Sequence, residues 1–478
     1  MKKRLRNLLV LSSAALVLCA SFASAPTEAP AEAPAQSPPK KHRIAVPEKL
    51  KKHARKIKAL AKPVKKAVSK TAVVAAQEVT TVVKEAHSLG GKILQGIINV
   101  MIAASPGKTR VYLPAPSSDP NSGVTVGVLP VFLFVDKEEV VKHILAPSLT
   151  YNKIFKANAT MRYYWYPKPG AQLFTIGSYA METDRRITVR YEDSEFLRKW
   201  FYFKFDYTLQ RDGSYRFSGF GPKSPEALES NLTFRDNRLQ VLAGINLPGN
   251  LHLIVGNRVR YANAVDGPID SLPKVSRFNP LPPGVDDPKT IVGQQFSFSY
   301  DSRDLPIAPI RGHYFNLYGE MTGRTGGDVR YERLGADLRG LYPFHNNRFV
   351  TGWRYVIEGE NGGGTVPFYE QTLLGGKDSL RGFGDWRFVD RNKMSWSLEE
   401  RVRFYTLNAF NVNVDFEVTP FYEAGEVYRE REGFQLPDLH HVFGVGFRSV
   451  VRPNVVGVID VGFSDQGTAL FVGIDYPF

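Results

Sequence analysis

The best candidate for a functional site in this sequence is an arginine within a long glycine-rich stretch. The stretch Leu373–Phe388 reads LLGGKDSLRGFGDWRF, with Arg381, Gly382 and Phe383 near its middle. Gly382 lets the backbone turn sharply, which places a guanidinium beside an aromatic ring. Loops of this length inside a β-domain are usually functional. An arginine that folds inward needs a carboxylate partner, because an unpaired buried charge is very costly.

The strands expected after this stretch carry acids that could pair with Arg381. Glu399 and Arg401 lie on the polar face of the first of them, and Glu423 lies on the polar face of the next. A charge-assisted bond to such a carboxylate would hold the loop against a wall. The simpler interpretation is a mobile surface loop with an exposed arginine. The residues alone leave both interpretations open.

The sequence offers no set of residues for covalent chemistry or for metal binding. Its nine histidines are scattered, and His440 and His441 are adjacent, so on a strand they face opposite ways. No G-x-S-x-G motif for a hydrolase nucleophile occurs. We therefore expect no enzyme, no cofactor and no metal site.

The N-terminus has the pattern of an export signal. Residues 1–25 contain a basic start, a short apolar run and small residues before the expected cleavage site. Cys19, the only cysteine, lies in this segment. Lipidation at Cys19 is the less favoured alternative, because Leu18 is larger than the usual residue there. No later apolar run is long enough for a transmembrane helix.

Positive charge is concentrated in one arm that precedes the rest of the chain. Lys40–Lys70 holds 13 Lys and Arg against Glu48, a net of +12, and the signal adds +4, so the remainder of the +15 chain is 15 − 12 − 4 = −1. Residues 26–73, rich in Pro, Ala and Lys, are expected to be disordered. The arm could contact lipid head groups, cell wall or periplasmic proteins, or be a solvated tether. An exported chain of this kind predicts no nucleic-acid partner.

Two types of ordered structure are expected after the arm. Residues 74–105 carry apolar side chains at the spacing of an amphipathic helix. Residues 122–478 consist of segments of about ten residues that alternate apolar and polar. Charges of both signs on the polar faces suit a wet lumen, and the segment lengths suit tilted strands that span a bilayer. The fold class is therefore all-β, a transmembrane antiparallel β-barrel with an N-terminal basic, partly helical extension.

The number of strands is harder to predict. The alternating runs number eight before residue 290 and nine from it, which makes 17. Bacterial single-chain barrels have even numbers of strands. The run 185–192 is the weakest, so we expect 16 strands.

Several stretches together resemble the BamA/TamA-like outer-membrane barrels, the bacterial surface antigen family. In chain order they are RFSGFGPKSPEALES (216–230), YDSRDLPIAPIRG (300–312), LLGGKDSLRGF (373–383), LEER (398–401), PFYEAGEVY (420–428), FGVGFR (443–448) and the final GIDYPF. The last resembles the family's C-terminal assembly signal, carried here by Gly473, Tyr476 and Phe478. The order and spacing of these motifs over residues 216–478 make the resemblance specific.

The resemblance implies a 16-stranded barrel in which Arg381, Gly382 and Phe383 fold into the lumen. It makes Glu423 the first candidate partner of Arg381, because the family has an acid there, although usually Asp. Glu399 is the second candidate, and Arg401 lies beside it. Residues 26–121 show no pattern of the family's periplasmic POTRA domains, so the chain resembles a short member without them.

The implied function is insertion or transport of proteins or lipids at the bacterial outer membrane, without chemistry. The implied partners are outer-membrane lipids and the barrel-assembly machinery that inserts the chain itself. A passive or gated pore plugged by the Arg381 loop, and a structural anchor that binds cell wall through the basic arm, are the alternatives.

Overall fold

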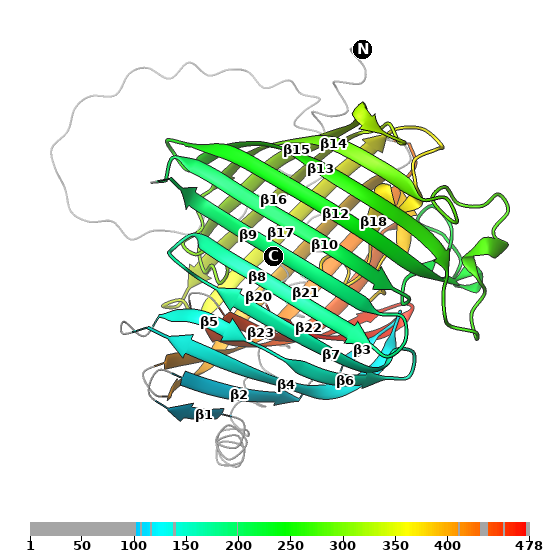
Figure 1. Ribbon diagram of the computed structural model, residues 1–478. Helices are drawn as coiled ribbons and strands as arrows, with labels where there is room; N and C mark the ends of the chain where they lie inside the picture. Colours follow the sequence, from blue (N-terminus) through cyan, green and yellow to red (C-terminus); the bar gives the residue numbers. More distant parts are fainter. Residues whose placement is uncertain are drawn as a thin grey trace, which may run out of the picture. The chain divides into compact units, whose positions relative to one another are not determined.

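The strands of this chain close into an antiparallel β-barrel. The computed structural model describes residues 102–105, 108–114, 117–136, 140–197, 199–409, 412–430, 438–452 and 455–474. Within these residues the barrel has 18 strands. They run obliquely around the wall (Figure 1), as the tilt of membrane barrels requires. The all-β class and the membrane barrel predicted from the sequence are therefore confirmed.

The wall follows chain order, with each strand paired to the next. Its elements are β2 (Lys108–Pro114), β3 (Ser117–Asp119), β4 (Gly123–Val135), β5 (Val141–Leu145), β6 (Ser148–Asn152), β7 (Lys156–Trp165), β8 (Ala171–Ala180), β9 (Arg185–Phe196), β10 (Phe201–Asp212), β12 (Ser230–Leu247), β13 (Leu251–Asp266), β14 (Lys289–Asp301), β15 (Gly312–Gly327), β16 (Glu332–Phe344), β17 (Phe349–Asn361), β20 (Asn392–Ala409), β21 (Val412–Tyr428), β22 (His440–Val451), β23 (Val455–Ser464) and β24 (Gly467–Ile474).

Two of the barrel strands are interrupted. β5 and β6 are pieces of one strand, because both pair with β4 on one side and with β7 on the other. β2 and β3 are pieces of another, since both pair with β4 in one continuous register: Pro114 faces Val128 and Ser117 faces Thr125. The 20 wall elements therefore make 18 strands.

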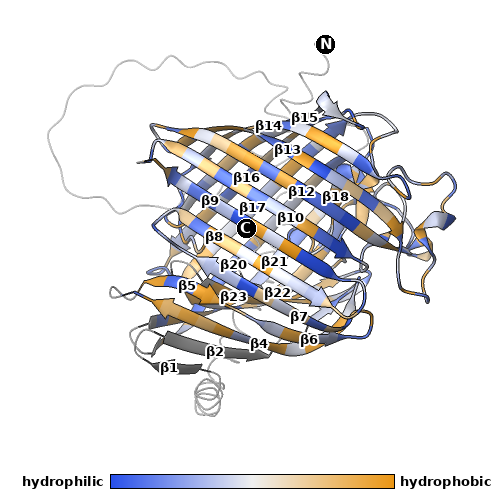
Figure 2. Ribbon diagram, in the orientation of Figure 1, coloured by the Kyte–Doolittle hydropathy of each residue, from blue (hydrophilic) through white to orange (hydrophobic). Residues whose placement is uncertain are grey.

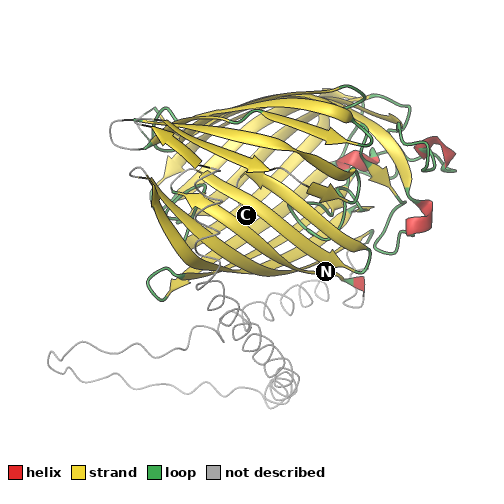
Figure 3. Ribbon diagram, turned by 90° about the horizontal axis from the view of Figure 1, so that it is seen from below, coloured by secondary structure: helices red, strands yellow, loops and turns green. Residues whose placement is uncertain are grey.

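The remaining described elements are short. β1 (Ile102–Ser105) forms a hairpin with β2, and β11 (Arg216–Phe217) pairs with β12. β18 (Thr372–Leu374) and β19 (Phe388–Asp390) pair with each other. The 3-10 helices η2 (Glu226–Leu228), η3 (Val275–Arg277) and η4 (Phe368–Glu370) lie toward one end of the barrel (Figure 3). No helix in the described part of the chain is long and apolar enough to span a membrane.

The predicted number of 16 strands is wrong, and the error lies at the start of the barrel. All 17 predicted runs, including 185–192, correspond to wall strands. The missing strand is β2–β3, which the sequence hides because Pro114 ends β2 and Pro120 directly follows β3. Proline cannot donate to a ladder and is confined in sheets to edges and strand ends. The sheet therefore begins before residue 122, the predicted start of the barrel domain.

The predicted segments before the barrel lie almost wholly outside the described residues. These are the signal peptide 1–25, the basic arm 26–73 and most of the helix 74–105. The last four residues of that helix are a correction, because Ile102–Ser105 form strand β1.

In the barrel wall, apolar side chains are exposed and charged side chains are buried, the reverse of a soluble protein. On β13, Val255 and Tyr261 are 58% and 54% exposed, whereas Arg258 and Arg260 are 6% and 7% exposed. Figure 2 shows the same alternation of apolar and polar residues along the wall strands. Period-2 alternation places the apolar side chains toward lipid and the charged side chains toward the lumen. This pattern excludes the soluble sandwich, which packs its apolar faces together.

The barrel closes between its first and last strands. Among the described residues, β24 pairs with β3 only at Leu470 and Ser118. The adjacent pair β23–β24 is joined over eight residue pairs, and β12–β13 over sixteen. We call the β3–β24 contact the seam.

Candidate functional site

The long segment between β17 and β20 folds into the barrel. It covers residues 362–391, and we call it the inner loop. Its β18–β19 hairpin contacts β20 and β21 of the wall. An apolar cluster holds it there, with loop residues Leu374, Leu380, Phe383 and Phe388 packed against wall residues Phe421, Val427 and Val442. The stretch identified from the sequence is therefore a buried element and not an exposed loop.

Arg381 is completely buried at the inner end of this loop and meets two acids of the wall. Its Nε donates to Glu423 Oε1 at 2.7 Å, and its backbone N donates to Glu423 Oε2 at 2.7 Å. Nη1 donates to Asp460 Oδ2 on β23 at 3.0 Å. The guanidinium carbon lies 3.6 Å from the centre of the Phe421 ring, a cation–π geometry. Glu423, the first candidate, is thus the principal partner.

The cluster around Arg381 is balanced in charge. Arg381 Nη2 lies 3.7 Å from Glu399 Oε2, and Arg401 Nε donates to Glu399 Oε1 at 2.6 Å. Arg448 donates to Asp460. We call this set the first anchor: Arg381, Arg401, Arg448, Glu399, Glu423 and Asp460. None of its three bases and three acids is more than 2% exposed. The attraction between paired charges offsets the free-energy cost of removing them from water, which an isolated buried charge would leave uncompensated.

Arg401 connects this anchor to a turn at the opposite mouth of the barrel. Its Nη1 donates to the carbonyl oxygen of Pro309 at 3.0 Å. Pro309 belongs to the turn between β14 and β15, where Ala308 is fully buried and Ile307 packs on an apolar cluster of the wall. The inner loop and this turn, which enter from opposite ends, are therefore joined through Glu399 and Arg401.

A second ionic anchor holds the inner loop, with the signs of charge on loop and wall exchanged relative to the first anchor. Glu370, at the end of η4, accepts from Arg258 Nη2 at 2.8 Å, Arg260 Nη1 at 2.7 Å and Tyr331 Oη at 2.5 Å. Arg333 Nη2 lies 3.5 Å from the same carboxylate. Here the loop supplies the acid and the wall supplies the bases. Glu370 is 1% exposed.

Sequence reasoning missed Glu370, Asp460 and Arg448. Arg448 stands in the FGVGFR motif, where it could have been identified as an inward-facing charge. Glu370 is the one charged residue in the apolar run PFYEQTLL, which is a usable signal for a buried ion pair. Asp460 is likewise the one charged residue of β23, VVGVIDVGFS, but its partners depend on the register of β23 with β22, where it faces Gly446.

Glycines allow the tip of the loop to approach the wall. A Cβ at Gly462 of β23 would overlap the carbonyl oxygen of Arg381. A Cβ at Gly382 would lie 2.9 Å from the Cβ of Ser464. The Gly382 position is thus defined by close packing.

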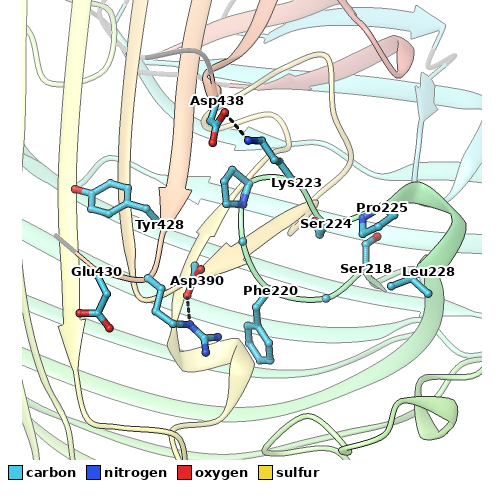
Figure 4. A pocket seen from close by; sticks show the side chains of 14 residues that line it. Ser218, Phe220, Lys223, Ser224, Pro225, Leu228, Asp390, Tyr428, Glu430 and Asp438 are labelled. Carbon is cyan, nitrogen blue, oxygen red and sulfur yellow. Dashed lines mark hydrogen bonds and ion pairs between the residues drawn. The ribbon is translucent and has the colours of Figure 1, made fainter. Parts of the chain in front are cut away.

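A hollow of about 600 Å³ opens at the mouth from which the inner loop enters (Figure 4). It is lined by the glycine-rich segment Ser218–Pro225, by Asp390 and by the end of β21. Two ion pairs line it: Lys223 lies 2.9 Å from Asp438, and Arg429 lies 3.4 Å from Asp390. We assign this hollow no ligand.

The other predicted residues are placed as follows. Gly473 lies on β24, whereas Tyr476 and Phe478 of the expected assembly signal lie outside the described residues. Within the described ranges, no three His, Cys, Asp or Glu residues are grouped so that they could hold a metal ion.

Asp385 of the inner loop gives a pH-dependent prediction. Burial and then the negative charge of Asp119 raise the pKa of the Asp385 carboxyl from 3.8 to about 7. A raised carboxyl pKa means that the folded loop favours the protonated form, so ionisation destabilises it increasingly as pH rises from 3.8 to about 7. We expect Asp385→Asn to remove this loss. The measurement is the unfolding temperature on gels from pH 4 to 8, and equal pH dependence in parent and variant would contradict it.

Comparison with known proteins places this barrel in a family. A model of the Omp85 superfamily domain matches residues 169–446. The outer membrane protein assembly factor BamA of Nitratidesulfovibrio vulgaris is 26% identical over 148 residues, which are 30% of this chain and 19% of that protein. The chain thus matches less than a quarter of the length of that relative.

Solved structures of similar barrels include two with low sequence identity. BamA from Haemophilus ducreyi lacking POTRA domains 1–3 is 14% identical, with a TM-score of 0.45 over 76% of this chain and 74% of that one. CdiB from Escherichia coli is 11% identical, with a TM-score of 0.41 over 78% and 62%. The family model covers more than half of the sequence, and on that ground this chain belongs to the Omp85 superfamily and is a β-barrel of the bacterial outer membrane.

Proposed function

We propose that this protein inserts or translocates other proteins at the outer membrane, and that it does so by opening the seam without covalent chemistry. The observation that carries the proposal is the single backbone pair, Leu470 with Ser118, between β24 and β3 among the described residues. A strand edge with unpaired N–H and C=O groups can add a strand from another chain. Since β1 already pairs with Lys108–Val111 of β2, a client strand would pair at β3 and β24 as it enters the membrane.

The inner loop occupies the interior of the barrel, which argues against an open passive pore. The inner loop is held by two buried ionic anchors, one at Arg381 and one at Glu370. Such anchors fix one arrangement when intact, and are costly when one partner is removed. A relative carries the name of an outer membrane protein assembly factor, which agrees with the proposal. Lipid transport is the alternative that the experiment distinguishes.

The test locks the seam with a disulfide. Ser118 and Leu470 face each other directly, and residues in that position have Cβ atoms about 4.5–5.5 Å apart. We expect that cells in which the oxidised Ser118→Cys/Leu470→Cys variant replaces the parent protein will lose other barrel proteins from the outer-membrane proteome. A reductant should restore them.

Each single-cysteine variant is the matched control and should behave as the parent. A normal proteome in cells whose seam is fully cross-linked would contradict the proposal. A changed lipid profile with an unchanged proteome would assign the protein to lipid transport instead.

A further inference from the structure

We infer that residues 382–387 of the inner loop hold the seam closed from inside the barrel, by contacting the wall on both sides of it. This inference rests on the proposed function, because it assigns the control of the same seam. The contacts lie at the mouth where β3 turns into β4 and where β23 turns into β24. They form a bridge that is independent of the Leu470–Ser118 backbone pair.

On the first-strand side the bridge reaches Asn121, in the turn between β3 and β4. Asn121 Nδ2 donates to the carbonyl oxygen of Asp385 at 2.8 Å. The loop is so close that a Cβ at Gly384 would overlap Asn121 Oδ1. Asn121 is itself fixed, because its backbone N donates to Asp119 Oδ1 at 2.6 Å and its carbonyl accepts from Arg216. Its side chain is therefore held toward the loop.

On the last-strand side the bridge has two contacts near the β23–β24 turn. Ser464 Oγ, at the end of β23, donates to the carbonyl oxygen of Gly382 at 2.9 Å. Arg387 Nε donates to Gln466 Oε1 at 2.7 Å. Arg387 also donates to the Ser224 hydroxyl at 2.9 Å and to its carbonyl at 2.8 Å. Its guanidinium is thus fixed in direction when it meets Gln466.

The two sets of contacts belong to one short piece of chain. Gly382 and Arg387 contact the last strands, and Asp385 between them contacts the first strand. Lateral separation of β3 from β24 must therefore break either the Asn121 bond or the Ser464 and Gln466 bonds. These side-chain contacts therefore add to the one backbone pair that the described residues of the seam make.

The experiment measures how often the seam is open in the intact protein in outer-membrane fragments. Ser118→Cys/Leu470→Cys protein is treated with an oxidant and a bulky maleimide together, so that closed seams cross-link and open seams are labelled. Removing one bridge contact should raise the ratio of labelled to cross-linked protein roughly five- to tenfold, the effect of about one hydrogen bond. The two test substitutions are Asn121→Asp, which removes the donor with little change of shape, and Gln466→Ala.

Two matched variants decide whether the effect belongs to the bridge. Gln466→Glu keeps the acceptor for Arg387 and makes the bond charge-assisted, so the ratio should not rise above the parent value. Lys393→Ala removes a bond from the wall to Leu373 O in the same loop, away from the seam, and should also leave it unchanged. Folding of each variant is checked by its heat-modifiable mobility on gels.

Parent-like ratios in both Asn121→Asp and Gln466→Ala would overturn the inference, as would an equal rise in Lys393→Ala. The outcome is separable from the proposed function, because the ratio needs no client protein. If the locked seam abolishes client assembly while the bridge variants keep the parent ratio, the proposed function stands and the bridge does not.

Discussion

Replacement of Arg381 by alanine is expected to release the inner loop and to lower the unfolding temperature of the barrel markedly. The substitution leaves Glu423, Glu399 and Asp460 buried with only Arg401 and Arg448 to balance them. Removing one partner from a buried ion pair costs about 3–5 kcal/mol. The measurements are heat-modifiable mobility on gels and single-channel conductance, which should rise as the loop leaves the lumen.

The control for Arg381→Ala is Arg324→Ala. Arg324 pairs with Glu332 at a site where both side chains are about half exposed, and such pairs contribute little. Arg324→Ala should therefore change neither the unfolding temperature nor the conductance. If Arg381→Ala is equally silent, the ionic anchor does not hold the loop.

The geometry also limits what a charge reversal can repair. In Arg381→Glu with Glu423→Arg, the new acid would still face Asp460 and Glu399, which lie 3.0 and 3.7 Å from the present guanidinium. Recovery of thermal stability should thus be small, and full recovery would show that Glu423 is the only important partner.

The second large effect is expected at the opposite anchor. Glu370→Gln keeps the shape of the side chain but removes the charge that Arg258, Arg260 and Arg333 share. Arg258 keeps Glu320 and Arg260 keeps Asp236 as partners, but the loop loses its own ionic tie to these arginines, which should destabilise it by about 3–5 kcal/mol. The measurement is the unfolding temperature of the barrel, together with protease cleavage within residues 362–391.

Glu332→Gln is the matched control, because it makes the same change at an exposed acid. It should leave cleavage and unfolding at parent values. Because the two anchors lie on different parts of the wall, the double variant Arg381→Ala/Glu370→Gln should lose about the sum of the single effects. A much smaller combined loss would mean that either anchor alone releases the whole loop.

The sequence predicted the class of fold because a membrane barrel leaves a local signal on every strand. The alternation of apolar and polar residues along β13 or β21 can be read from the sequence without knowing which strands lie beside them. The strand β2–β3 escaped because prolines interrupt its pattern, and at the seam a strand has fewer ladder bonds to satisfy. Strand number was therefore the feature most easily misjudged.

The candidate site was predictable in part for a related reason. Arg381 was identifiable from its loop, and Glu423 from its face on the next strand but one. Asp460 and Glu370 could not be paired with their partners, since those pairings depend on register between strands and on how the loop crosses the lumen. No local pattern specifies that path.

The even number of strands has a consequence for how the chain enters its membrane. Strand β2 begins and strand β24 ends at the same rim, the one that also carries the Pro309 turn. The first and last strands therefore have their outer ends on one side, and the strands at the other rim are joined by closed connections. The inner loop is the connection with the largest load of charge, and its residues 362–391 hold four acids and four bases, a net of zero. A segment that crosses as a neutral hairpin carries no net charge through the lipid and then finds fixed counter-charges on the wall.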